Sequence, residues 1–512
     1  MHTLRQSLLV VAVCGGLLGI LAADAWAQDA QQPQQGQQTQ GQQNQSPAPQ
    51  GQQNEAQPAA PIPAYHSPLA SEAGDDQSSE QTEPLAPDTR PLSGAQILSL
   101  GSLENDHSYW QPHADVAGVF DTNPQEGPNT SSWGAWASFS GGVDLHQISG
   151  NSDLTLSYLG GATIASGANA SNGVVQQLGI VEALTFRRWH LSLIDQLSYL
   201  PGSGFGFGGL GSAGVSTGGS VGLGTTFGVP NETALTGLGQ TLANASTAEA
   251  TVNLTPRGSL TFVGGYSLVQ YSTGGFVNST EANFQGGYNY LLTRKDTVAV
   301  LYTYSAVRYG NVDQSIDLHT IQGSYARRIT GRLAFQVQAG PQFGLFRTPI
   351  SSGSGSTVGG ATASSSTQFL WSLSSNMQYQ LRRTLLALSY NHSVSAGAGV
   401  LAGSVANVVS GSVTRQMSQT FSSGLTAGYS RNNGLTTESA GSTTPTNQTY
   451  DYWFVGANFS RPLGRTLGLT FSYQLEYQSS DASFCIGPTC GTSVIRNLIS
   501  VGLGWHERPR LF

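Results

Sequence analysis

The sequence predicts an all-β protein, an antiparallel up-and-down β-barrel that crosses a membrane with about eighteen strands, sixteen being the alternative. Three observations predict it. Apolar residues alternate with small polar ones along most of the chain, short connections alternate with long ones, and only 10% of the residues are charged, against roughly 25% in soluble domains. After residue 23 no apolar run reaches the roughly 20 residues that a membrane-spanning helix needs.

The chain begins with a predicted secretory signal, residues 1–27. Arg5 supplies the positive charge, residues 8–21 the apolar stretch, and Ala27 ends a small-x-small cleavage site. Retention as an anchor and lipid attachment at Cys14 are the alternatives, but a bulky valine precedes Cys14 where lipid attachment needs a small residue.

Residues 28–108 form a predicted disordered tail. Its first part, 28–54, contains 14 glutamines and has too little apolar surface to offset its chain entropy. The tail has ten acidic residues against Arg90, a net charge of −9, so the acidity of the chain, −8 in total, belongs to the tail. Such a charge argues against nucleic-acid binding.

The body, residues 109–512, has the period-two pattern of strands with one apolar face. In 333–346 the odd positions are apolar, whereas the even ones are mostly Gln and Gly, and 466–478 repeats the pattern. A soluble β-sandwich also alternates, but its polar face normally carries Lys and Glu. Here that face carries Ser, Gln, Asn and Gly, and lysine occurs only once, at Lys295.

Short turns and long loops alternate strictly along the body. The short turns lie at 149–152, 187–190, 255–258, 293–296, 328–332, 381–384, 415–419 and 461–465, and the longer loops include 201–243, 347–365, 432–448 and 479–492. This alternation is typical of transmembrane barrels, and eight turns with nine loops predict eighteen strands. The loop 201–243 either stays external or folds inward and narrows the lumen.

Aromatic residues near the strand ends, among them Trp133, Tyr199 and Trp505, fit the two interfacial girdles of a membrane barrel. The chain also ends on Phe512, although Pro509 interrupts the last alternation. These features resemble the bacterial outer-membrane β-barrel class, whose last strand commonly ends in an aromatic residue read by the barrel assembly machinery. The resemblance implies an outer-membrane location with the tail in the periplasm.

The opening strand, ADVAGVFDTNP at 114–124, is similar to the first strand of barrels associated with bacterial exopolysaccharide systems. This second resemblance covers about eleven residues. It implies a role beside polysaccharide export.

Most charged residues within the predicted strands fall on the polar set and are expected to line the lumen. These candidates are Asp144, His146, Glu249, Glu281, Glu476 and Arg496. Asp144 and His146 could also form an acid–base pair, but no histidine of the chain lies in a hydrolase or zinc-protease motif. We therefore expect no enzyme activity, no metal and no cofactor.

Glu182 and Asp195 instead fall on the apolar set. Pairing their strands so that Phe186 stands opposite Leu191 places the two carboxylates opposite each other, which is costly on a lipid-facing surface. One explanation is a second copy or another partner covering this face, with one carboxyl protonated. The alternatives are a β-bulge that turns both side chains inward, or true exposure to lipid.

Cys485 and Cys490 are the only cysteines after the signal sequence. In an exported protein such a pair predicts a local disulfide. Zinc is the weaker alternative, because no histidine or second cysteine pair flanks them.

The expected function is passive passage of small hydrophilic solutes through the lumen. The body has nineteen basic and eighteen acidic residues. Because strong ion selectivity needs rings of charge of one sign, this balance suggests weak selectivity. The alternative is a non-conducting envelope scaffold or an exopolysaccharide-export-associated barrel. Outer-membrane lipid, the assembly machinery and a second copy are the expected partners.

Overall fold

The computed structural model describes residues 108–123, 133–166, 172–200, 240–272, 277–310, 314–349, 363–395, 403–418, 420–435, 449–480 and 493–511. The predicted signal sequence, almost all of the predicted tail, both cysteines of the predicted disulfide and Phe512 lie outside these residues. No helix in the described ranges is long and apolar enough to cross a membrane.

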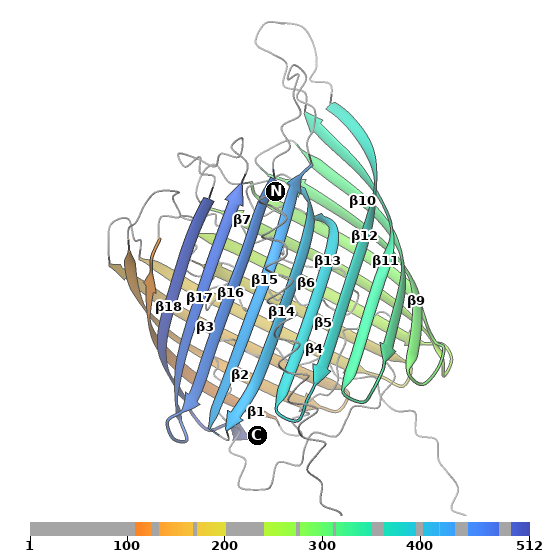
Figure 1. Ribbon diagram of the computed structural model, residues 1–512. Coiled ribbons are helices and arrows are strands. Elements are labelled where there is room, and N and C mark those ends of the chain that lie inside the picture. The colour runs from red at the N-terminus through yellow and green to blue at the C-terminus, as the bar shows by residue number, and fades with distance from the viewer. Residues whose placement is uncertain are drawn as a thin grey trace, which may run out of the picture. The chain divides into compact units, whose positions relative to one another are not determined.

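Eighteen long antiparallel strands form a closed barrel, as the sequence predicts (Figure 1). The first nine are β1 (Tyr109–Asp121), β2 (Gly134–Ser149), β3 (Ser152–Ser166), β4 (Gly173–Thr185), β5 (Trp189–Leu200), β6 (Thr241–Asn253), β7 (Gly258–Tyr271), β8 (Ser279–Leu291) and β9 (Asp296–Tyr309). The others are β10 (Ser315–Arg328), β11 (Leu333–Pro349), β12 (Ala363–Gln380), β13 (Thr384–Ser395), β14 (Ser404–Ser418), β15 (Phe421–Gly434), β16 (Thr449–Pro462), β17 (Leu467–Ser480) and β18 (Ser493–His506).

The barrel closes between its first and last long strands. β1 pairs with β18 from His113 opposite His506 to Asp121 opposite Leu498. A two-residue strand, β19 (Arg510–Leu511), then pairs with the start of β1. Eighteen strands spaced about 4.8 Å apart and tilted by about 40° give a backbone diameter of about 36 Å. Barrels of this strand number leave room for an aqueous channel.

The connections alternate in length as predicted. Eight connections of two to four residues join the strands at one end, here called the turn end, and the nine longer ones lie at the other, the loop end. The turn predicted at 415–419 is displaced, because β14 continues to Ser418 through a register irregularity after Gln416. Its hairpin turn therefore falls just before Phe421.

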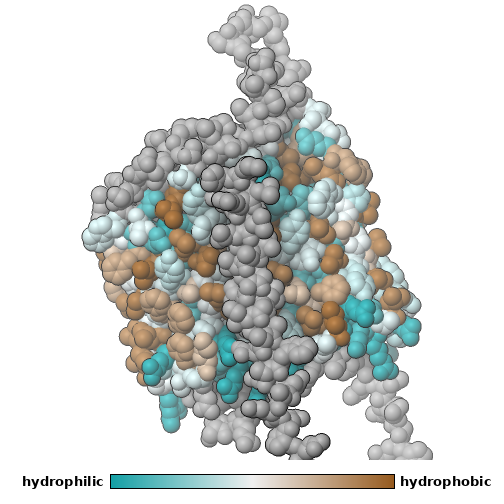
Figure 2. All heavy atoms as spheres, in the orientation of Figure 1, coloured by the Kyte–Doolittle hydropathy of each residue, from teal (hydrophilic) through white to brown (hydrophobic). Residues whose placement is uncertain are grey.

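Side chains alternate between an inner and an outer face. On β9 the outer positions include Val300 and Tyr302, which are 65% and 43% exposed, while the intervening Leu301 is buried. Figure 2 shows hydrophobic residues over the visible outer wall, with hydrophilic ones toward its lower rim. An apolar outer face around a polar interior is the arrangement that a bilayer-spanning barrel requires.

Three clusters of a tyrosine, an aspartate and an arginine stand on the outer surface at its two edges. They are Tyr304, Asp317 and Arg308 at the loop end, Tyr429, Asp451 and Arg431 at the loop end, and Tyr325, Asp296 and Arg327 at the turn end. In each cluster the tyrosine hydroxyl donates a hydrogen bond to the aspartate. A guanidinium nitrogen of the arginine lies 2.7 to 3.9 Å from an oxygen of the same aspartate. From Asp296 to Arg308, β9 rises about 30 Å along the barrel axis at a tilt of about 40°. We call the outer surface between these edges the apolar belt.

Candidate lumen site

The inner face is divided into two walls that differ in charge. Within the described strands, the inner positions of β1–β10, β17 and β18 contain all seven inner-face carboxylates, and we call this side the acidic wall. They are Asp115, Asp121, Asp144, Asp153, Glu249, Glu281 and Glu476. The described inner side chains of β11–β16 have no charge and are mainly Gln, Ser, Asn, Thr, Tyr and Gly. This second side is the neutral wall.

The two walls face each other across the lumen. In a closed barrel of eighteen strands, a strand faces the one nine places further on, so β2 faces β11 and β6 faces β15. Asp144 of β2 therefore stands across the lumen from the glutamines of β11, such as Gln336 and Gln338. The inner face therefore has carboxylates on one side and neutral hydrogen-bonding groups on the other.

A histidine–aspartate cluster lines the turn end of β1–β3. His113 Nδ1 lies 3.3 Å from Asp144 Oδ2, and His146 Nε2 lies 2.8 Å from Asp153 Oδ1. Gly142 stands opposite His113, and a Cβ at Gly142 would collide with both the Tyr158 carbonyl oxygen and the His113 ring. The missing side chain at this position therefore lets the imidazole lie close to β2. Asp144 and His146, both predicted from the sequence, thus have separate partners and form no pair with each other.

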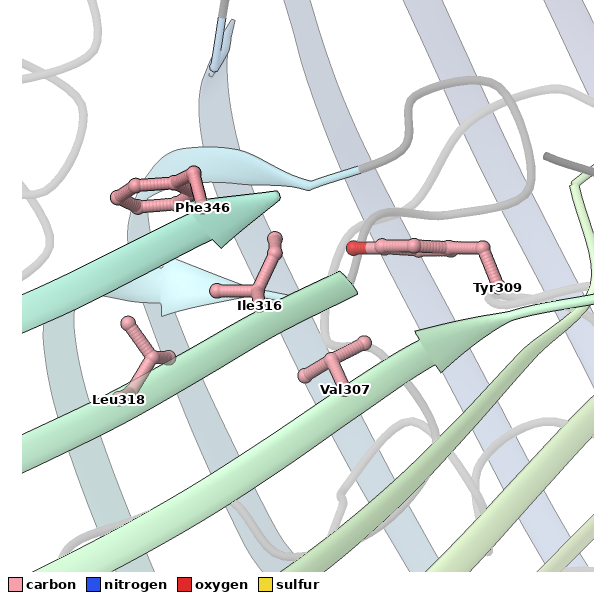
Figure 3. Packing of buried hydrophobic residues seen from close by; sticks show 5 residues of the cluster. All are labelled: Val307, Tyr309, Ile316, Leu318 and Phe346. Atoms are coloured by element: carbon pink, nitrogen blue, oxygen red, sulfur yellow. The ribbon is translucent and has the colours of Figure 1, made fainter. Parts of the chain in front are cut away.

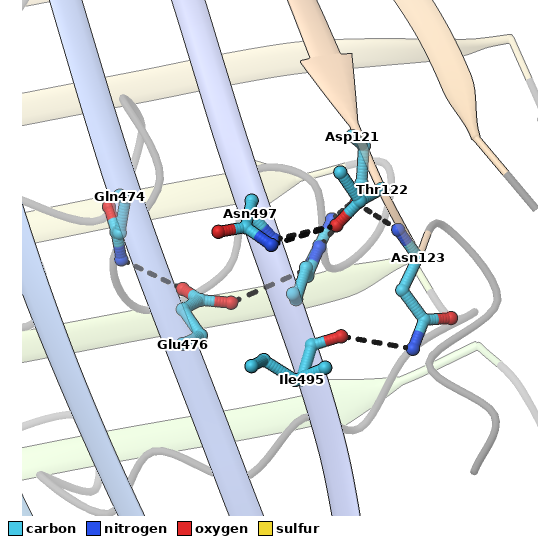
Figure 4. Close-up of polar contacts among 8 residues, drawn as sticks. Asp121, Thr122, Asn123, Gln474, Glu476, Ile495 and Asn497 are labelled. Carbon is cyan, nitrogen blue, oxygen red and sulfur yellow. Dashed lines mark hydrogen bonds and ion pairs between the residues drawn. The ribbon is translucent and has the colours of Figure 1, made fainter. Parts of the chain in front are cut away.

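A buried ion cluster closes the barrel near the loop end (Figure 4). Arg496 of β18 donates from Nε and Nη2 to Asp121 Oδ2 of β1, at 2.9 and 2.6 Å. Its Nη1 lies 3.8 Å from Glu476 Oε2 of β17. The Arg496 and Asp121 side chains are 1% and 0% exposed, and Asn123 and Gln474 each donate one further hydrogen bond to the carboxylates.

The other two predicted lumen residues also lie on the inner face, each with a hydroxyl donor. Thr251 donates to Glu249 at 3.2 Å, and Ser305 donates to Glu281 at 2.7 Å. No arginine or lysine forms an ion pair with either carboxylate among the described residues. Each of these carboxyl groups therefore has a hydroxyl donor and no neighbouring cation within the described strands.

An apolar cluster narrows one side of the loop-end mouth (Figure 3). Val307, Tyr309, Ile316, Leu318 and Phe346, from the loop ends of β9, β10 and β11, pack together on the inner face. Val394 of β13 and Leu435 beyond β15 pack against them. Gly403, between β13 and β14, has a φ of +89°, and a Cβ there would come within 2.5 Å of Ile316 Cδ1. Contact between strands three to five places apart means that the wall bends inward here.

The predicted pairing of Glu182 with Asp195 is wrong. Glu182 stands opposite Leu193, and Asp195 stands opposite Ile180, a shift of two residues. The shift arises because the Phe186 N–H donates to the Trp189 carbonyl at 2.8 Å, so that β5 begins at Trp189 and the turn is shorter than predicted.

Both carboxylates nevertheless remain on the outer face, and the register of β4 shows no bulge beside either. Asp195 lies near the middle of the apolar belt. It accepts hydrogen bonds from Asn244 Nδ2 at 2.9 Å and Ser246 Oγ at 3.1 Å, both on β6. Glu182 accepts a 3.4 Å hydrogen bond from Ser152, closer to the turn end.

Four inner-face residues were not among the sequence candidates: His113, Asp115, Asp121 and Asp153. Asp115 and Asp121 share the odd positions of β1 with His113, whereas Val116 and Phe120 on the even positions are exposed on the outside. The same period-two rule, applied to β1 and to Asp153 of β3, would have found them. No group of three or more potential metal-ligating residues occurs in the described part of the chain.

No protein-family model matches the chain, and no curated protein matches it. Among solved structures, several bacterial proteins match over most of the chain with low overall similarity. Acinetobacter baumannii OccAB3 has a TM-score of 0.38 and 12% identity, with 78% of this chain and 99% of that chain covered. Pseudomonas aeruginosa OccK2 (OpdF), in complex with glucuronate, has a TM-score of 0.38 and 10% identity, with 78% and 98% covered. The outer membrane protein OpdK from Pseudomonas aeruginosa has a TM-score of 0.35 and 8% identity, with 78% and 99% covered. The function must therefore be argued from the residues of this chain.

Proposed function

We propose that the protein is an outer-membrane channel for passive passage of small hydrophilic solutes. The division of its two faces supports this proposal: a closed eighteen-strand wall with an apolar outer belt surrounds an inner face of Ser, Thr, Gln, Asn and carboxylates. Buried polar side chains are costly unless water or a partner satisfies them. The many polar side chains on the inner face therefore favour a water-filled lumen over a dry apolar core. The turn end faces the periplasm in this proposal, because short turns do so in such barrels.

Passage requires no chemistry at the wall. The hydroxyl and amide groups of the neutral wall can form hydrogen bonds to a solute, directly or through bridging water, and so replace part of its hydration shell. The apolar cluster around Ile316 restricts the loop-end mouth on one side, so large solutes are excluded. In this proposal, the size of a solute and its capacity to form hydrogen bonds determine whether it passes.

Liposome swelling tests the proposal. The full chain, purified and reconstituted into liposomes, should admit small neutral sugars and give swelling rates that fall as sugar size increases. Protein-free liposomes are the control for leakage. If the smallest sugar gives no swelling although gel migration shows a folded barrel, the channel proposal is wrong and the scaffold alternative is favoured.

A further inference from the structure

The positive charges of the barrel are almost all kept out of the lumen. Within the described strands β1–β18, six arginines lie on the outer face: Arg308, Arg327, Arg347, Arg415, Arg431 and Arg461. Most of the remaining basic residues lie in the short turns, for example Arg187, Arg188 and Lys295. Only Arg328 and Arg496 occupy inner positions in these strands, and Arg496 is bound to Asp121.

The inner carboxylates, by contrast, are distributed along the whole path. Asp115 lies at the middle of β1, Asp144 and Asp153 lie toward the turn ends of β2 and β3, and Glu249 lies toward the turn end of β6. Glu281 lies at the loop end of β8. One oxygen of Asp115, Oδ2, is buried without a hydrogen-bond partner. The accessible carboxylates are Asp144 and Asp153 near the turn end, with side chains 23% and 45% exposed, and the half-buried Glu281 near the loop end.

We propose that the lumen selects small cations over anions, and that its preferred solute joins a positively charged nitrogen to hydroxyl or amide groups. The charged nitrogen would follow the acidic wall while the polar groups contact the Gln- and Ser-rich neutral wall opposite. Walls of one charge sign focus the field and raise the local concentration of counter-ions. This inference rests on the proposed channel function and replaces the weak selectivity expected from the near-zero charge of the body.

Planar bilayers with a tenfold KCl gradient test the inference on the full-length protein. The sign of the reversal potential should show that K⁺ passes more readily than Cl⁻, and its size should correspond to a several-fold permeability ratio. The variant Asp115→Asn/Asp144→Asn/Glu249→Gln keeps side-chain shape and replaces three inner carboxyl groups with amides, and it should lower the K⁺/Cl⁻ permeability ratio at least twofold. Asp451→Asn, on the outer face, is the matched control and should leave the ratio unchanged.

Each result decides between the two proposals. Channels with a permeability ratio at or below one would overturn the cation preference and leave the channel function standing. An unchanged ratio in the triple variant, with a folded barrel shown by heat-dependent gel migration, would also overturn it. If folded protein gives no current at all, both the cation preference and the proposed channel are wrong.

Discussion

Replacing Arg496 with methionine should strongly weaken the seam at which the barrel closes. Arg496 joins β18 to Asp121 of β1 and lies against Glu476 of β17, and all three side chains are at most 4% exposed. Removing the cation leaves two buried carboxylates near each other, and breaking such a buried pair typically costs about 3–5 kcal/mol. Because Asn123 and Gln474 still donate to the carboxylates, we expect about 3 kcal/mol, which is roughly 150-fold in the unfolding equilibrium.

Urea unfolding of the full chain in lipid vesicles, followed by tryptophan fluorescence, measures this difference. Arg510→Met is the matched control, because Arg510 pairs with Glu507 on the surface with 54% and 34% exposure, and such pairs contribute at most about 1 kcal/mol. The triple variant Arg496→Met/Asp121→Asn/Glu476→Gln should recover much of the loss. An Arg496→Met barrel within about 0.5 kcal/mol of the parent would refute this account of the seam.

Three further changes test other parts of the structure. Gly142→Ala would place a Cβ against both the Tyr158 carbonyl and the His113 ring, so it should displace the imidazole and shift its NMR signal; an unaltered signal would mean that the close approach does not exist. Ile316→Ala should loosen the apolar cluster at the loop-end mouth and raise single-channel conductance, whereas equal or lower conductance would show that the cluster does not restrict the path. If a second copy covers the outer carboxylates, Glu182→Leu/Asp195→Leu should change the oligomer mass in detergent relative to Ser375→Leu, and an unchanged mass would exclude that interface.

The sequence predicts which face each side chain occupies better than which residue it pairs with. Strand side chains alternate with a period of two, so a segment such as 333–346 reveals its inner and outer sets directly. A register error of two residues keeps every side chain on its face. This is why Glu182 and Asp195 were correctly placed on the apolar set but wrongly placed opposite each other.

Contacts between strands distant in sequence had no local signal. Asp121 and Arg496 are 375 residues apart, and only closure of the barrel brings them together. The charge division of the lumen was hidden for a related reason. The whole body has nearly equal numbers of acidic and basic residues, and the excess of carboxylates inside appears only when each charge is assigned to a face or a turn.

Thiol modification of two adjacent residues tests most directly whether solutes pass along the inner face. Asn376 and Ser375 are neighbours on β12, and the first points inward while the second points outward. In planar bilayers, a hydrophilic methanethiosulfonate reagent should reduce the single-channel current of Asn376→Cys and leave Ser375→Cys unaffected. The parent chain, which retains its own Cys485 and Cys490, provides the background. Block of the outward variant alone, or of neither variant, would contradict passage through this lumen.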